Sequence, residues 1–386
     1  MIIVVALIVL LSLGGVCSAD LVFEQTNLVS SVTGVAPVID PNLKNPWGVA
    51  FGPTGAFSIS NERTGTATQY DGNGAPQPTV ITVPPAAGSP AGTPGSPTGQ
   101  VFNPTNDFQI PPLIGGTPAV LLFATLEGTI SGWIGGATAQ REVDNSASAS
   151  SYTGLALANN GSGNFLYAAN HTHNTIDVFS ANFAPALGFP SFTDPTLPAG
   201  FAVYNIQNLG GTLFVTYENE TTGGGIVDAF TPSGVLIRRI SSNGAGGVLD
   251  SPWGLALAPA GFGPFGGALL VGNEGNGRIS AFDPTTGQFL GQLIDAQTQP
   301  IANPGLWALT FGTGGLGGDP NALYFTAGIQ GEREGLFGVI RPVDVAVAVP
   351  GPSSALLFGL GLLTAITAQA VRPRAAHIRA FLFRRG

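Results

Sequence analysis

Polar side chains that are able to bind a cation recur after short apolar runs of this sequence. Five such positions follow the second of two strand-like runs: Asn61-Glu62, Glu127, Asn170-His171, Glu218-Asn219 and Asn273-Glu274. Carboxylate and amide oxygens are the ligands that a hard cation such as Ca²⁺ prefers. The sequence therefore predicts a metal site, if the fold brings the loops together, with these ligands: Glu62, Asn170, Glu218, Asn273 and Glu274. The alternative is structural, because Asn after a strand is also a common turn residue.

Two of the three histidines flank a single residue in the segment Asn170-His171-Thr172-His173-Asn174. Alternate residues of an extended segment point the same way, so His171 and His173 form a possible pair of transition-metal ligands. The third histidine, His377, lies near the C-terminus, and a zinc site with three histidine ligands is therefore not expected. A polar loop between strands is the favoured role of this segment.

The residues that usually carry covalent catalysis are missing. The sequence has no Gly-x-Ser-x-Gly motif, and its single cysteine, Cys17, lies in a segment that we expect to be removed. Trp47, Trp253 and Trp307 recur at equivalent places in a repeat, which indicates packing rather than ligand binding, whereas Trp133 lies elsewhere and is the better candidate for a surface contact. A protein that binds without catalysis is therefore favoured over an enzyme.

A repeat positions these residues. "NPWGVAFGPTGAFSISNERTGTATQYDGNG" from Asn45 matches "SPWGLALAPAGFGPFGGALLVGNEGNGRISAFD" from Ser251 in the order of its turns and apolar runs. Related units begin at Asn106, Tyr152, Tyr204 and Leu306, which makes six between Pro46 and Arg341. Units of about 40–50 residues with several period-2 runs are typical of propeller blades. The sequence therefore predicts an all-β, six-bladed β-propeller, and a pair of stacked sheets is the alternative.

Two segments outside the repeat have a predicted place. Asn27 to Val32 is strand-like and precedes the first unit, so we expect it to pair with Phe337 to Arg341 and close the ring. Pro84 to Phe102 is rich in Pro, Gly, Ser and Thr, and this composition predicts a mobile loop between blades.

The fifth unit resembles an NHL or gluconolactonase-type propeller blade through "SPWGLALA" and "NGRISAFD". The resemblance implies a divalent metal held by Glu, Asn and Asp side chains, as in gluconolactonase-like propellers. "NPWGVAFGP" and "SPWGLALAP" also resemble an uncharacterised family of exported bacterial propeller proteins with a sorting tail. That likeness implies architecture and location, but no reaction.

Charge is scarce and unevenly distributed. Only 9% of residues are charged, and the formal net charge is −9. Five of the 13 basic residues lie after Pro352, which leaves eight against 22 acidic residues in the remainder, a net charge of −14. Phosphate binding needs clustered Lys and Arg, so nucleic acid is excluded as a partner.

The two ends of the chain predict export and membrane retention. Residues 1–19 have an apolar run and small residues before Asp20, which is typical of a cleaved signal peptide, and residues 20–345 are the expected propeller. Ser353 to Val371 is uncharged and about long enough to cross a bilayer, with arginines after it that favour a cytoplasmic C-terminal side. The domain at 346–386 is therefore a predicted membrane anchor.

This tail resembles a PEP-CTERM sorting signal. The likeness rests on the motif Val349-Pro350-Gly351-Pro352, the apolar span and the terminal arginines, with Gly351 where the family has Glu. The resemblance implies an exosortase-type processing enzyme as a partner, and an outward-facing protein that is anchored in the cell membrane or released after processing.

Three functions fit these observations. The favoured one is a non-catalytic propeller that binds a protein or polysaccharide at the cell surface or in the extracellular matrix. The second is a metal-dependent lactonase-like hydrolase with a cation in the central channel, for which Ca²⁺ is the expected cofactor. The third is a structural component of a surface layer. A tight site with three or more converging ligands would favour the hydrolase.

Overall fold

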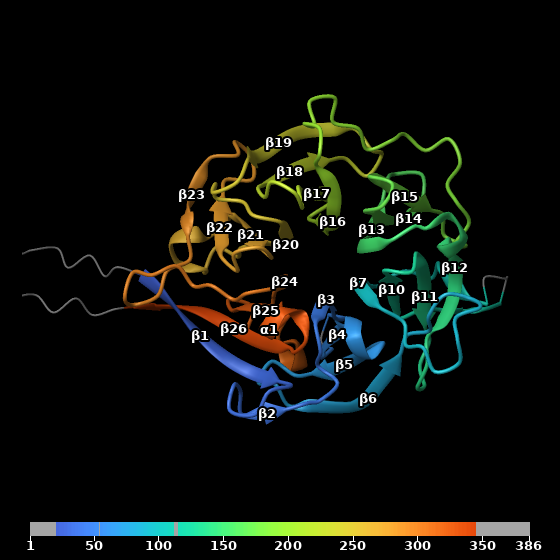
Figure 1. The fold of residues 1–386 in the computed structure, drawn as a ribbon, viewed down its shortest axis with the longest axis horizontal. Coiled ribbons are helices and arrows are strands. Elements are labelled where there is room, and N and C mark those ends of the chain that lie inside the picture. Colours follow the sequence, from blue (N-terminus) through green and yellow to red (C-terminus); the bar gives the residue numbers. More distant parts are fainter. Residues whose placement is uncertain (1–20, 54, 112–114, 345–386) are drawn as a thin grey trace, which may run out of the picture. The chain divides into compact units, whose positions relative to one another are not determined.

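The described part of the chain is a six-bladed β-propeller (Figure 1). The structure, a computed structural model, describes residues 21–53, 55–111 and 115–344. Six sheets surround a common axis, and each begins with its innermost strand, as Figure 1 shows. The predicted architecture is confirmed, and two stacked sheets are excluded.

The blades follow one another along the chain. Blade 1 holds β3 (Pro46–Ala50), β4 (Phe57–Asn61), β5 (Thr66–Tyr70) and β6 (Pro76–Thr82). Blade 2 holds β7 (Pro97–Phe102), β10 (Leu121–Thr125), β11 (Thr129–Trp133) and β12 (Gln140–Asp144), with a small hairpin of β8 (Gln109–Ile110) and β9 (Thr117–Pro118) nearby in the chain. Blade 3 holds β13 (Tyr152–Asn159), β14 (Asn164–Asn170) and β15 (Thr175–Phe179).

The second half repeats this order. Blade 4 holds β16 (Ala202–Leu209), β17 (Thr212–Glu218), β18 (Gly225–Phe230) and β19 (Leu236–Asn243). Blade 5 holds β20 (Pro252–Leu257), β21 (Leu269–Asn273), β22 (Ile279–Phe282) and β23 (Phe289–Gln292). Blade 6 holds β24 (Leu306–Phe311), β25 (Leu323–Ala327) and β26 (Leu336–Asp344), and β1 (Leu21–Ser30) and β2 (Val38–Ile39) complete it.

The first strand closes the ring. β1 pairs antiparallel with β26, with Asn27 opposite Gly338 and Val29 opposite Phe337. The predicted closure is therefore confirmed, although the paired segment runs from Leu21 to Ser30 and not from Asn27 to Val32. Pairing β26 on both sides removes an open edge that would otherwise be free to bind another chain.

One prediction about a loop was wrong. The Pro/Gly-rich segment Pro84 to Phe102 ends in β7, the inner strand of blade 2, so this blade begins at Pro97 and not at Asn106. The low apolar content of "PTGQVF" hid the strand. Its polar side chains Thr98 and Gln100 are buried because neighbouring backbone carbonyls accept their hydrogen bonds.

The Pro-Trp-Gly motif owes its glycine to the packing of the inner strands. A Cβ atom on Gly48 would lie 2.6 Å from the carbonyl oxygen of Thr98, in the inner strand of the next blade. A Cβ atom on Gly254 would collide with the carbonyl oxygen of Trp307 in the same way. Glycine therefore lets adjacent inner strands approach closely near the axis.

The tryptophans of the motif fill the axis. Trp47, Trp253 and Trp307 form a buried cluster with Tyr204, although they come from blades 1, 5, 6 and 4. The rings of Trp47 and Trp307 are stacked with centroids 3.7 Å apart, and Trp253 Nε1 donates a hydrogen bond to the Thr153 carbonyl of blade 3. The expected packing role of these residues is confirmed, and the aromatic cluster separates the two ends of the axis.

The predicted signal peptide, membrane span and Val349-Pro350-Gly351-Pro352 motif lie outside the described residues. Among the residues that the structure describes, no helix has the length and apolar character needed to cross a membrane.

Candidate metal site at one end of the axis

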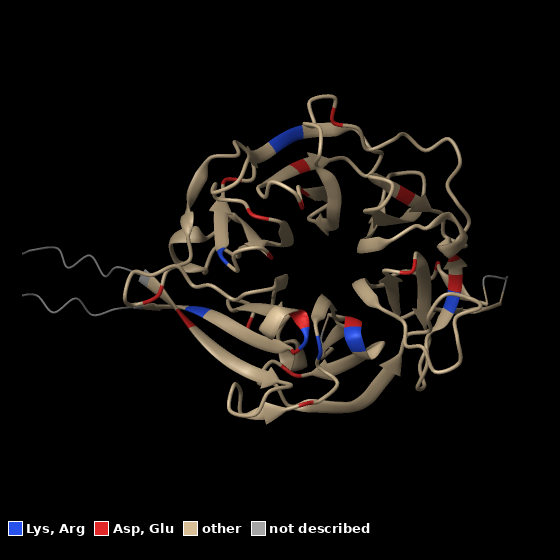
Figure 2. Ribbon diagram, viewed as in Figure 1, with Lys and Arg blue, Asp and Glu red and all other residues tan. Residues whose placement is uncertain are grey.

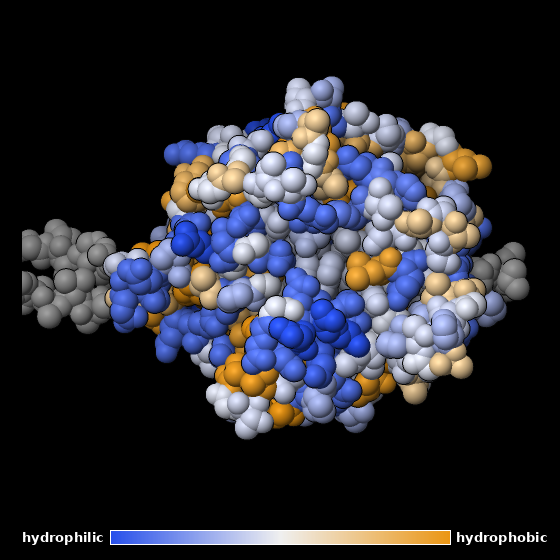
Figure 3. Space-filling model, in the orientation of Figure 1, coloured by the Kyte–Doolittle hydropathy of each residue, from blue (hydrophilic) through white to orange (hydrophobic). Residues whose placement is uncertain are grey.

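The loops after the second strand of each blade meet at one end of the axis. The last residue of each second strand pairs with the start of the inner strand: Asn61 with Pro46, Thr125 with Pro97, Asn170 with Tyr152, Glu218 with Ala202, Asn273 with Pro252 and Ala327 with Leu306. Figure 2 shows acidic segments on several of the loops around the central opening. In Figure 3, hydrophilic side chains gather over α1 (Ile329–Glu332) and the short helix at Glu62–Thr64.

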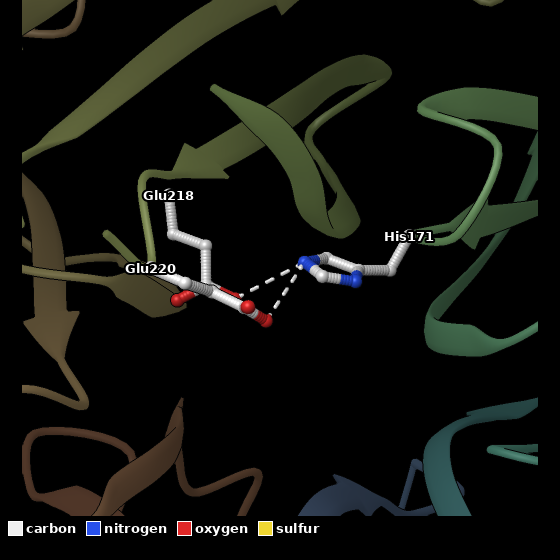
Figure 4. Close-up of side chains that lie close together, drawn as sticks. All are labelled: His171, Glu218 and Glu220. Carbon is white, nitrogen blue, oxygen red and sulfur yellow. Dashed lines mark ion pairs between the residues drawn. The ribbon is translucent and has the colours of Figure 1, made fainter. Parts of the chain in front are cut away.

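His171, Glu218 and Glu220 form a group with metal-binding geometry (Figure 4). His171 follows β14, and its ring points across to two carboxylates of the next blade, Glu218 at the end of β17 and Glu220 just after it. Nε2 of His171 lies 3.3 Å from Oε1 of Glu218 and 3.7 Å from Oε1 of Glu220. No hydrogen-bond acceptor among the described residues is aligned with the buried Nε2 atom, so these are contacts of charge rather than directed hydrogen bonds.

The spacing of these three atoms fits a metal ion. The ligand atoms all lie within 4.8 Å of one another. Two ligand atoms that are each about 2.1 Å from an ion lie about 3.0–3.4 Å apart at coordination angles of about 90–110°. Small side-chain rotations would therefore place one ion among all three. The imidazole favours Mn²⁺ or Zn²⁺ over the Ca²⁺ that the sequence predicted, since Ca²⁺ prefers oxygen ligands throughout.

The buried glutamates change the pKa values of the groups around them. Glu218 is only 5% exposed, and its interaction with His171 raises the pKa of the imidazole. Tyr204 lies beside them with its ring centroid 5.9 Å from that of His171. Burial and the neighbouring glutamates raise the pKa of the Tyr204 phenol well above its ordinary value, so this hydroxyl stays protonated.

A second pair of carboxyl groups lies close to the first group. Glu274 of blade 5 lies close enough to Glu332 of blade 6 for the two carboxyl groups to interact, and the charge of Glu218 also acts on Glu274. Burial, followed by the charges of Glu332 and Glu218, raises the pKa of Glu274 to about 7. A carboxyl group with this pKa is able to give or take a proton near neutral pH.

Glu62 is held on the same rim by Asn45. Asn45 Nδ2 donates a hydrogen bond to Glu62 Oε2 at 3.0 Å, and Asn45 Oδ1 accepts one from Trp307 Nε1 at 2.9 Å. Arg63 contacts the Glu332 carbonyl oxygen and lies 4.0 Å from Glu62 Oε2. Glu62 therefore belongs to the acidic rim, but it lies outside the group around His171.

The side-chain amides of the two predicted ligands Asn170 and Asn273 form hydrogen bonds within the fold. Asn170 Nδ2 donates to Ser150 and Asp177, and its Oδ1 accepts the Ser151 N–H. Asn273 Oδ1 accepts the Asp250 N–H, and Nδ2 donates to the Val248 carbonyl. Of the five predicted ligands, only Glu218 lies in the group with metal-binding geometry.

Three residues at this end of the propeller were not among the five predicted metal ligands. His171 was assigned to a polar loop, Glu220 lies one residue beyond the predicted pair, and Glu332 ends α1, five residues after the last residue of β25. The predicted parallel orientation of His171 and His173 was wrong, because residues 171–174 form a turn in which Asn174 N–H donates to the His171 carbonyl. The signal that pointed to His171 was its place directly after the second strand.

The fold and the His/Glu group define the class of protein: a six-bladed propeller with a candidate metal site at one end of its axis. No family model matches the chain. An uncharacterised protein of Acanthamoeba polyphaga mimivirus is 32% identical over 340 residues, which covers 81% of this chain and 78% of the relative. A second uncharacterised mimivirus protein is 30% identical over 337 residues and covers 81% and 83%. The chain therefore belongs to the family of these mimivirus proteins.

Solved structures share the fold at low identity. A Bacteroides thetaiotaomicron protein of unknown function matches with a TM-score of 0.51 and 12% identity, over 83% of this chain and 76% of that one. A glucose dehydrogenase matches with a TM-score of 0.50 and 12% identity, over 82% and 98%. The bacterial, exported family that the sequence resembles stays a prediction, because the relatives found are viral proteins.

Proposed function

We propose that this protein is a metal-dependent binding propeller. The observation that carries the proposal is the convergence of His171, Glu218 and Glu220 from two adjacent blades on one point. Three protein ligands leave coordination positions of a bound ion open, and an oxygen atom of a partner fills them. The acidic rim repels anions by itself, but a bound cation would attract an anionic group. The expected partner is therefore a protein or polysaccharide that carries such a group.

Calorimetry with metal ions tests the proposal. Purified protein is titrated with Mn²⁺, Zn²⁺ and Ca²⁺, and we expect one site, with Mn²⁺ or Zn²⁺ bound more tightly than Ca²⁺. Glu218→Gln removes a ligand charge from the site, whereas Glu24→Gln makes the same change on the exposed part of β1. Loss of the site in the first variant and not in the second supports the proposal. Heat that is equal in both variants argues against it.

A metal-dependent hydrolase is the second candidate, and the Glu274–Glu332 pair is the observation that favours it. A carboxyl group with a pKa of about 7 close to a metal site suits general acid–base catalysis. Metal-dependent hydrolysis of lactones that is lost in Glu274→Gln, with metal binding retained, would identify an enzyme. Absence of turnover in the metal-loaded protein would leave binding as its function.

The location of the protein is proposed from the two ends of the sequence. Residues 1–19 support export, and residues 346–386 support retention in the membrane with the propeller facing outward, before or after processing by an exosortase-type enzyme. Fractionation of cells that express the full chain, or a chain ending at residue 345, tests this. Both forms in the soluble cytoplasmic fraction would refute it.

A further inference from the structure

A separate cavity of about 450 Å³ lies at the opposite end of the axis from the His/Glu group. It is lined by the later residues of the inner strands, such as Ala50 of β3, Phe102 of β7 and Asn208 of β16. The His/Glu group instead adjoins the first residues of the inner strands. Trp253 lines the inner part of the cavity and belongs to the aromatic cluster, which therefore closes the cavity toward the other end.

The lining of this cavity is uncharged throughout. It combines the half-buried rings of Phe51 and Phe102 with side-chain amides and hydroxyls, including Gln207 and Thr310. Asp107 is not among the lining residues, but its carboxylate accepts a hydrogen bond from the amide of Asn164, which is. A cavity of this volume is within the range of small-molecule sites, about 300–1,000 Å³.

Gln100 forms part of the wall of this cavity, and the backbone of neighbouring strands fixes its orientation. It lines the cavity, it is only 5% exposed, and its Nε2 donates hydrogen bonds to the carbonyl oxygens of Gly48 and Ser58 at 2.8 and 3.0 Å. These two acceptors fix the orientation of the amide, so the other atom, Oε1, is the acceptor. Oε1 is buried and has no donor among the described residues. Gln100 therefore shapes the wall of the cavity, and the side chains available to a ligand are the less buried ones, such as Gln207 and Thr310.

We propose that this cavity binds the neutral end of a saccharide. Because the aromatic cluster closes the cavity, a chain molecule has to enter end first. The ends of a peptide carry an ammonium or a carboxylate group, and burying either charge against an uncharged lining is costly. The end of a neutral saccharide chain carries only hydroxyl groups and apolar ring faces, which match the amides and the Phe51 and Phe102 rings. This inference concerns neutral ligands, and it does not depend on the metal site at the other end.

Titration with defined disaccharides tests the proposal. The full-length protein is titrated with maltose, cellobiose, xylobiose and chitobiose up to about 10 mM, beyond the millimolar range of a weak specific site. We expect at least one of them to bind. Gln207 lines the cavity, and its side chain has no hydrogen bond to another described residue, so Gln207→Leu changes the cavity without breaking an internal contact. It should weaken binding by about fivefold to tenfold.

The matched controls separate this site from the rest of the molecule. Gln77→Leu makes the same change on the outer strand β6, and Glu218→Gln alters the metal site; both should leave the saccharide affinity unchanged. Thr310→Val should weaken binding as Gln207→Leu does, because it removes a hydroxyl group from the lining. The proposal is overturned if no disaccharide binds, if Gln207→Leu binds as tightly as the wild type, or if a short peptide binds in this cavity and the disaccharides do not.

Discussion

Glu274 and Glu332 interact across the boundary between blades 5 and 6, where the charge of Glu332 raises the pKa of the partly buried Glu274. Two neighbouring carboxyl groups cannot both ionise without repulsion, and burial adds to the cost of the second charge. The pair therefore holds a proton near neutral pH, in agreement with the pKa of Glu274, which is raised to about 7. Because each blade contributes one of the two groups, the pair couples proton binding to the packing of the blades.

The pair predicts a dependence of stability on pH. The pKa of Glu274 is raised from 4.5 in the unfolded chain to about 7 in the fold, so the stability associated with its protonated form is fully present below about 4.5 and is lost as the pH rises through 7. Glu332→Gln removes one charge and lowers this pKa. We expect the variant to be more stable than the wild type at pH 8, by about 1.4 kcal/mol for each unit by which the pKa falls.

Thermal unfolding between about pH 5 and pH 8 measures this difference. The advantage of Glu332→Gln should grow as the pH rises, whereas Glu24→Gln, on the exposed part of the closing strand, should follow the wild type at every pH. A constant difference across the range would show that the two glutamates do not share a proton.

Closure of the ring predicts a large effect of one side chain in β1. Phe23 is 2% exposed and packs against Phe262 and Phe265, with ring centroids 5.1 and 5.8 Å away. Phe23→Ala leaves a cavity between the closing strand and blade 5, and it should lower the free energy of unfolding by about 3–5 kcal/mol. Denaturant titration measures the loss, and the exposed neighbour provides the control: Glu24→Ala should change stability by less than about 0.5 kcal/mol. Equal losses in the two variants would contradict this role.

The close approach of the inner strands predicts a cost for any side chain at Gly254. The Cβ atom of Gly254→Ala would collide with the Trp307 carbonyl oxygen and lie 3.0 Å from the Leu309 N atom. Forcing the strands apart should lower the free energy of unfolding by about 1–3 kcal/mol. Gly244→Ala is the matched control, because a Cβ atom there meets nothing within 4 Å. If both variants unfold at the same denaturant concentration, packing does not explain the motif.

The fold could be predicted from the sequence because each blade repeats the same order of turns and strands. The copies at Asn45 and Ser251 share both the Pro-Trp-Gly motif and a residue with positive φ before the proline, 45° at Asn45 and 46° at Ser251. Strand β7 escaped prediction because its buried side chains, Thr98 and Gln100, are polar and bond to the backbone of neighbouring strands.

The site could be predicted only in outline. The candidate residues were chosen because they follow the second strand of each blade. This choice identified the correct end of the axis, since strand pairing fixes which loops meet there. It did not distinguish Asn170, which bonds to its own turn, from His171, which faces the neighbouring blade. That distinction depends on the backbone of the turn at residues 171–174, and a single residue of shift reverses which side chain faces the axis.

Magnetic resonance of bound Mn²⁺ tests the central claim, that His171 holds a metal ion together with Glu218 and Glu220. Protein loaded with one equivalent of Mn²⁺ should show the nitrogen coupling of a directly coordinated imidazole in pulsed electron paramagnetic resonance. The coupling should disappear in His171→Ala and persist in the control His173→Ala, whose side chain is exposed and outside the group. Bound Mn²⁺ without nitrogen coupling in the wild type, or coupling that survives in His171→Ala, would contradict this claim.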